Sequence, residues 1–349
     1  MNLIRRSTQA LAVLAVLALA ASGCSKEEKK EEAAKDEAAS PAEGDKAAKA
    51  VEKAPGAARA VAGSMGKSGF AIMDKESNLV LGFSLAKVTA SALWKQFGPL
   101  VMAQAGEDYQ KFKATCGMDP MTAIESVIIG GKIDDEDSMV FVMNGVTRSQ
   151  LIDCGKKMAA AEGEKIEIAD EGKLTKVVDK EGQTMYLGWL DDKTMVGSPK
   201  GEDKAVVEGI LAGKGGLDGN AEMMNLLGNT DTNGALWFAV SDTGDMGSGG
   251  PVKFNAAYGT VSFEGGLKLD VGMRTASAED ATKAVDELTK QLAGLKGGPT
   301  GKFVSKLQLK ANEADVIAQL SLTDAELMEL IQTVMSDPGA MGFMNAFGG

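Results

Sequence analysis

The sequence predicts an α+β protein built from a ββαββα-like unit that is used twice, with antiparallel sheets and helices packed on one face. Residues 124–143 read as a strand, an acidic turn and a second strand, and a helix capped by Thr147 follows. The same pattern returns without a gap at 254–273, with Ser277 as the cap. Because hairpins rather than long crossovers join the strands, we expect an antiparallel sheet.

Each unit is expected to begin with a further strand and to end with a second hairpin and helix. The leading strands are expected at 79–85 and 235–241, the second hairpins at 184–197 and 303–320, and the final helices at 199–211 and 324–335. Only the first unit has an extra polar hairpin and a long helical stretch, expected at 164–179 and 89–115. The first unit then spans 64–213 and the second 214–335, and a Gly- and Met-rich tail at 336–349 is expected to fray rather than to cap a groove.

The amino-terminal segment 1–23 reads as an export signal. Arg5 and Arg6 precede an apolar run at 10–21, which is shorter than the roughly 20 residues that a transmembrane helix needs. The stretch from Leu19 to Cys24, LAASGC, resembles the lipobox of bacterial lipoproteins, although Ala21 stands where that family most often has Leu. The resemblance implies that Cys24 carries a diacylglycerol and becomes the first residue of the mature protein. With Ser25 rather than Asp next to it, the resemblance favours an anchor in the outer membrane of the cell envelope.

Residues 24–63 are expected to form the lipidated start and a charged tether. Apart from two valines the segment has no sizeable apolar side chain, so it cannot offset its ordering entropy by burial. Its positive and negative charges nearly cancel, with eight Lys and Arg against nine Asp and Glu after Cys24. We therefore expect a spacer rather than a binding segment, with a coil span of about 35 Å.

Composition excludes several classes of function. Starting from the chain's net charge of −12, removing the signal's two arginines and the tether's −1 leaves about −13 on residues 64–349, which argues against nucleic-acid binding. The sequence contains no His, so Ser-His-Asp and Cys-His catalysis and His-bearing zinc sites are excluded. We expect no cofactor, no metal and no enzymatic activity.

Two cysteines, Cys116 and Cys154, remain beside Cys24. In an oxidising compartment we expect them to form a disulfide, and two buried free thiols are the alternative. Closing a loop of this length would stabilise the fold by about 4 kcal/mol in the chain-entropy model.

The stretch FKATCGMDP, the strand IESVIIGG and the later GALWFAV resemble uncharacterised exported lipoproteins of bacteria with two membranes, over about two-thirds of the body. That family has no established activity, so the resemblance implies a fold and no reaction.

Three motifs resemble ligand sites and are better explained otherwise. Gly66-Lys67-Ser68 lacks the first glycine of a P-loop, and 229–234 starts like a calcium loop but has Val240 where a Glu is required. The acidic cluster 134–137 is expected to be a solvated hairpin tip.

These patterns predict a non-enzymatic envelope lipoprotein that is attached to the membrane through Cys24 and binds another envelope component. A carrier or chaperone for a hydrophobic ligand, such as a lipid or a lipoprotein, is the main alternative. A carboxylate-based hydrolase is a weaker one, because the sequence marks no pair of facing acidic groups.

Overall fold

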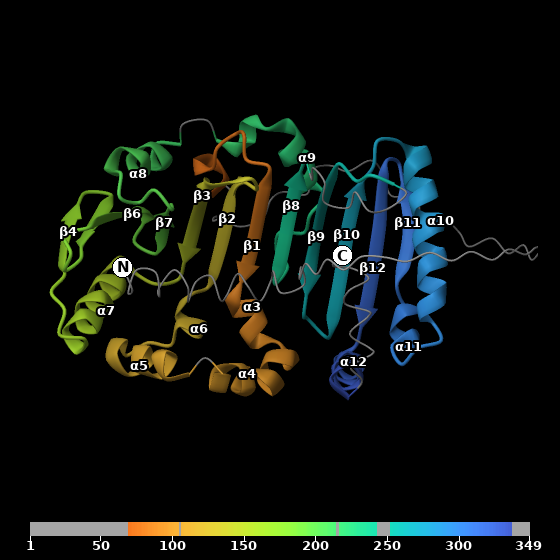
Figure 1. Cartoon of the computed structure of the whole chain (residues 1–349), viewed down its shortest axis with the longest axis horizontal. Helices are drawn as coiled ribbons and strands as arrows, with labels where there is room; N and C mark the ends of the chain where they lie inside the picture. Colours follow the sequence, from red (N-terminus) through yellow and green to blue (C-terminus); the bar gives the residue numbers. More distant parts are fainter. Residues whose placement is uncertain (1–68, 105, 214–215, 243–251, 337–349) are drawn as a thin grey trace, which may run out of the picture. The chain divides into compact units, whose positions relative to one another are not determined.

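The computed structural model describes residues 69–104, 106–213, 216–242 and 252–336. These residues all lie within one compact unit. Its core is a twelve-stranded antiparallel sheet in the order β11-β12-β10-β9-β8-β1-β2-β3-β7-β6-β5-β4 (Figure 1). The predicted α+β class is therefore confirmed.

The first half of the chain forms seven strands of the sheet and the helices from α3 to α8. Its strands are β1 (Leu79–Ser84), β2 (Ser126–Lys132), β3 (Asp135–Asn144), β4 (Glu167–Glu171), β5 (Leu174–Val178), β6 (Thr184–Asp191) and β7 (Thr194–Gly197). Its helices are α3 (Leu85–Ala90), α4 (Ala92–Gln104), α5 (Gly106–Cys116), α6 (Pro120–Ala123), α7 (Arg148–Ala161) and α8 (Lys204–Leu211). A helical turn at 69–72 precedes β1.

The second half repeats the strand-and-helix order without the extra hairpin. Its strands are β8 (Leu236–Ser241), β9 (Ala256–Ser262), β10 (Leu267–Arg274), β11 (Gln308–Asn312) and β12 (Asp315–Leu322). Its helices are η1 (Leu217–Gly219), α9 (Ala221–Gly228), α10 (Ala278–Leu295), α11 (Gly301–Val304) and α12 (Asp324–Ser336).

The two halves have the same strand order outward from the central β1–β8 pair. One side runs β1-β2-β3-β7-β6 and the other β8-β9-β10-β12-β11, and only the first is extended by β5 and β4. The pairing register is also the same: Asn144 pairs with Thr194 in one half, and Arg274, which ends β10 as Asn144 ends β3, pairs with Asp315 in the other. Duplication itself stays a prediction, but the pairing geometry agrees with it.

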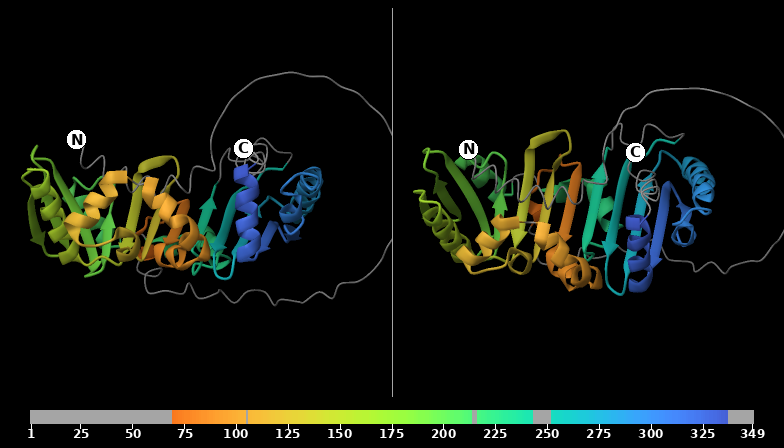
Figure 2. Two further views of the ribbon diagram at one scale, coloured as in Figure 1. Left: turned by 90° about the horizontal axis from the view of Figure 1, so that it is seen from below. Right: turned by 60° about the horizontal axis from the view of Figure 1, so that its bottom comes forward.

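Helices lie on both faces of the sheet, so the prediction that they pack on one face is wrong. Successive residues of β3 show this, because Val142 belongs to the buried cluster that includes the helical turn at 69–72 and α9, whereas Met143 belongs to the one that Leu151 of α7 packs against. The views in Figure 2 show the same arrangement, with α9 on one side and α4, α7, α10 and α12 on the other. The physical reason is that both alternating sets of side chains on β3 are apolar, and each set needs a cover.

The structure corrects one predicted helix and one predicted hairpin. The stretch expected at 89–115 is divided into α3, α4 and α5, since Ser91 caps one break and Gly106, with a φ of 70°, begins the helix after the other. The hairpin expected at 303–320 starts later, because 301–304 is the short helix α11. Helix α9 was not predicted at all, although Met223, Leu226 and Leu227 on it are fully buried.

Aromatic rings lie over glycines on neighbouring strands. Gly82 pairs with Trp237, and a Cβ at Gly82 would lie 2.0 Å from that ring. Gly272 has the same relation to Tyr258. The missing side chain therefore makes room for a large ring on the same face, which fills the core between the sheet and α9.

Candidate binding surface

The four central strands, β9, β8, β1 and β2, direct only apolar residues and glycines to one face of the sheet. The register places Leu81 opposite Phe238 on β8 and opposite Ile129 on β2, and the pairs above and below continue the pattern. We call six partly exposed members of this surface the central apolar face; they are Leu79, Leu81, Phe83, Ile129, Leu236 and Phe238. Val127 and Val261 are partly exposed on the same side, but Val127 packs against the Met143 cluster. Such a surface is unusual on a soluble protein unless it meets a partner or a ligand.

The opposite face of the same strands is sealed. Val80, Ile128 and Ala239 are at most 3 % exposed and pack against the helical turn at 69–72, η1 and α9. By contrast, no residue of the central apolar face belongs to any of the four buried clusters among the described residues. Figure 1 looks onto this face, with α7 on one side of it and α10 on the other.

The central apolar face is organised about the Leu81–Phe238 pair. Leu79 and Leu236 each begin one of two equivalent strands, and Leu81 and Phe238 each lie two positions further along. The two central equivalent residues thus pair with each other. Both halves therefore contribute apolar side chains to one surface.

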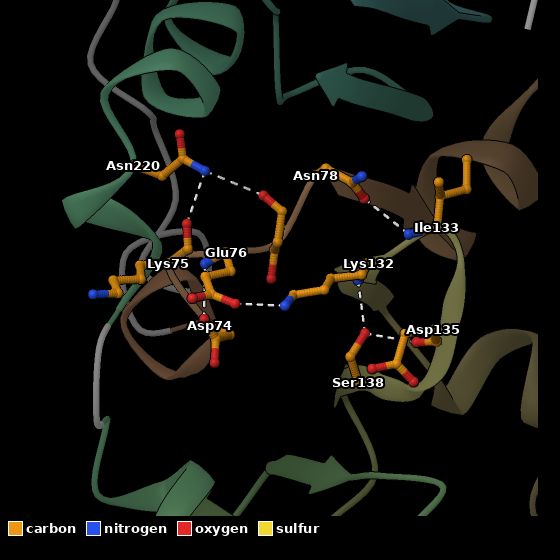
Figure 3. Close-up of polar contacts among 10 residues, drawn as sticks. Asp74, Lys75, Glu76, Asn78, Lys132, Ile133, Asp135, Ser138 and Asn220 are labelled. Carbon is orange, nitrogen blue, oxygen red and sulfur yellow. Dashed lines mark hydrogen bonds and ion pairs between the residues drawn. The ribbon is translucent and has the colours of Figure 1, made fainter. Parts of the chain in front are cut away.

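A polar network closes one end of the central strands (Figure 3). The Asn220 side chain, which also caps α9, donates to the carbonyls of Lys75 and Ser77, while Lys132 pairs with Glu76. The Asn78 side chain accepts the backbone N–H of Ile133 at 2.8 Å. These bonds connect the start of β1 to the β2–β3 hairpin and to Asn220 of the second half. They therefore help to hold β1 in its position between β2 and β8.

Helices α3, α4, α5 and α6 surround an open hollow of about 340 Å³ near the other end of β1. Trp94, Met102 and Met121 give it an apolar wall, and Tyr109 and Asp119 a polar one. Its volume lies at the lower end of the range for small-ligand sites. It is open to solvent and not an enclosed lipid cavity.

Asp119 organises the polar wall of the hollow. Its carboxylate accepts from the Tyr109 hydroxyl at 2.6 Å, the Met121 backbone N–H at 2.9 Å and Lys113 at 3.1 Å. Burial opposes ionisation, but these bonds outweigh it and hold the pKa of Asp119 below its ordinary value. Burial and the Asp119 carboxylate together raise the pKa of Tyr109 to about 12.

The two cysteines expected to pair, Cys116 and Cys154, form a disulfide with Cα atoms 4.6 Å apart. It joins the end of α5 to α7, and Lys111 and Glu162 form a second link between the two segments at 2.7 Å. The hollow is therefore held against the first half of the sheet.

The other sequence motifs take the structural roles expected of them or lie outside the described residues. Cys24, the tether, the P-loop-like residues 66–68 and the tail after Ser336 lie outside. The acidic tip at 134–137 is exposed, and Lys200 approaches Asp137 at 3.4 Å. In the calcium-like segment, Asp231 accepts the backbone N–H of Asn233, which makes the segment a turn.

Sequence reasoning did not identify which residues form the central apolar face. The signal was the run of apolar residues at both alternating positions of 79–85 and 235–241, but it does not show which alternate set stays exposed. The strand register was needed to show that all the half-exposed members gather on one side.

Comparison with family models, with curated proteins and with solved structures finds no match for this chain. Among the described residues, no helix has the length and apolarity to cross a bilayer. The same residues contain no group of three or more Cys, Asp or Glu arranged to hold a metal ion.

Proposed function

We propose that this chain is a lipid-anchored envelope protein that binds another envelope component through its central apolar face and catalyses no reaction. The observation that carries the proposal is the half-exposed surface about Leu81 and Phe238, which offers contact area but no hydrogen-bonding side chain. The lipobox-like sequence at Cys24 supports the anchor, and Ser25 after it favours the outer membrane.

A non-polar surface of this kind suits an apolar segment of a partner. Burying it would gain about 25 cal/mol for each Å² removed from water, whereas a polar ligand would lose its own hydrogen bonds. The central strands are paired on both sides, so the partner would meet side chains rather than free backbone groups.

A carrier for a hydrophobic ligand is the second candidate. The hollow lined by Trp94 and Met102 supports it only for a small apolar group that stays in contact with water, because the hollow is open and does not enclose a lipid. Lipid extracted with the purified protein would support this candidate over protein binding.

Photocrosslinking in cells tests the leading proposal. A photoreactive benzoylphenylalanine is placed at position 238 of the full-length, anchored protein, and a matched probe at position 133, since Ile133 is an exposed apolar residue outside the face. We expect one specific envelope partner to be captured from position 238 and not from position 133. We also expect a Cys24→Ala variant to capture much less of it.

Equal capture from both positions, or none from position 238, would contradict binding through this face. Capture that does not depend on Cys24 would contradict the role of the anchor.

A further inference from the structure

Helix α4 is apolar but partly exposed. Its sequence, ALWKQFGPLVMAQ, contains one charged residue, Lys95. Leu100 is 58 % exposed, the highest value for a large apolar side chain among the described residues, and Trp94, Phe97 and Val101 are only half-buried. A helix of this length that served only the fold would turn such residues inward.

The same part of the chain differs in charge from the rest of the acidic body. From Ser77 to Gly106 the sequence contains Lys87 and Lys95 and no Asp or Glu. Lys87 donates to the Asn233 carbonyl and lies 4.0 Å from the Glu264 carboxylate, whereas Lys95 is exposed and forms no ion pair among the described residues. Residues 77–106 therefore repel an anionic surface less than the rest of the acidic body does, although α5 begins directly afterwards with Glu107 and Asp108.

Apolar side chains, a tryptophan and a lysine without an ion-pair partner, here Lys95, are a composition that a lipid interface favours. Tryptophan rings prefer the headgroup level, and lysine can extend its ammonium group to the phosphates while its stem stays among apolar atoms. An apolar protein groove would also accept Leu100 and Phe97, but it would not account for the absence of acidic residues.

The chain between the anchor and the fold is long enough for such a contact. The segment from Cys24 to Gly69, taken as a coil, spans about 35 to 40 Å. A body attached in this way stays close to the bilayer, so even a weak contact is strengthened by a high effective concentration.

We propose that α4 docks the folded body on an anionic phospholipid surface, with Leu100 and Phe97 entering the headgroup region and Lys95 facing the phosphates. This inference rests on the proposed lipid anchor, and it leaves the central apolar face free for the partner.

Vesicle binding by the full mature chain with Cys24→Ala, which cannot be acylated, tests the inference. Vesicles of phosphatidylethanolamine with about one-third phosphatidylglycerol are compared with phosphatidylcholine vesicles, by cosedimentation and by tryptophan fluorescence. Trp189 and Trp237 are 3 % and 5 % exposed, so a blue shift on binding reports Trp94.

We expect Leu100→Glu to weaken binding to the anionic vesicles at least about tenfold, because a buried leucine is exchanged for a charge. Ile133→Glu places the same charge at the other large apolar residue that is exposed in the described part of the chain, and we expect it to change binding less than about twofold.

The inference is overturned if the chain does not bind anionic vesicles, binds phosphatidylcholine equally well, or binds unchanged with Leu100→Glu. None of these results touches the crosslink from position 238 or the lipid on Cys24, so failure of the membrane contact is distinguishable from failure of the proposed function.

Discussion

Single residues in this fold act mainly by the space they leave. Trp237 is 5 % exposed and belongs to the largest buried cluster, and its ring occupies the place where a side chain on Gly82 would be. Strand propensity alone would disfavour a glycine inside β1, so its presence is explained by the ring of the neighbouring strand.

A Gly82→Ala substitution should destabilise the protein by about 1–3 kcal/mol, because the added methyl overlaps the Trp237 ring and the ring has no free space to move into. Gly209→Ala is the matched control, since a Cβ at Gly209 in α8 meets nothing within 4 Å. The control should be neutral or more stable, as helix propensity predicts. Urea unfolding of both variants measures the difference, and equal stabilities would refute this account of the glycine.

Residues at matching positions of the two halves form different kinds of polar contact. Arg274 donates to Asp315 at 2.8 and 3.0 Å, and Tyr258 donates to the same carboxylate at 2.9 Å. In the first half the matching position pairs Asn144 with Thr194 at 3.0 Å. The backbone positions are the same while the chemistry differs, which is why the repeat was visible as a pattern rather than as identity.

At the scale of elements, the junction between α5 and α6 depends on one carboxylate. Asp119 caps α6 and binds Tyr109 and Lys113 of α5. Because the hydrogen bonds lower its pKa in the folded state, its stabilising contribution is complete above the unfolded pKa of 3.8 and is lost as the pH falls through the lower folded value.

The free energy of unfolding should therefore fall more steeply as the pH drops below about 5 in the natural protein than in Asp119→Asn, which cannot ionise. Asp108→Asn removes a carboxylate from an exposed position on α5 and serves as the control. Urea midpoints of unfolding measured across this pH range test the prediction. An identical loss of stability in the natural protein and in Asp119→Asn would show that the Asp119 carboxylate contributes nothing to it.

The elements that the sequence predicted best were those with strong local signals. The caps at Thr147 and Ser277 start α7 and α10 where expected, since Thr147 forms a capping box with Gln150 and Ser277 accepts from Asp280. Helix α9 has eight residues, too few for a clear periodicity, and its place is decided by burial against the sheet. Local pattern therefore predicted the capped helices α7 and α10, but not the division of 89–115 into α3, α4 and α5 or the short helices α9 and α11, which depend on tertiary packing.

At the scale of the whole molecule, the strand register decides where the candidate site lies. Alternation along 79–85 and 235–241 could be read from the sequence, but not which alternate set would stay half-exposed. That outcome depends on α9 and the turn at 69–72 covering one face, while α7, α10 and α12 lie beside the central strands on the other. The prediction that helices pack on only one face of the sheet was wrong for the same reason, because the sequence did not show which helices would cover which face.

The proposed function requires that the folded body is attached to a membrane, and the lipid on Cys24 is the proposed means of attachment. Mass spectrometry of the amino-terminal peptide of the protein purified from its native membrane tests that claim most directly. The account predicts a peptide that begins at Cys24 and carries a diacylglycerol on its thiol. A peptide with unmodified Cys24, or one that begins upstream of it, would contradict the account.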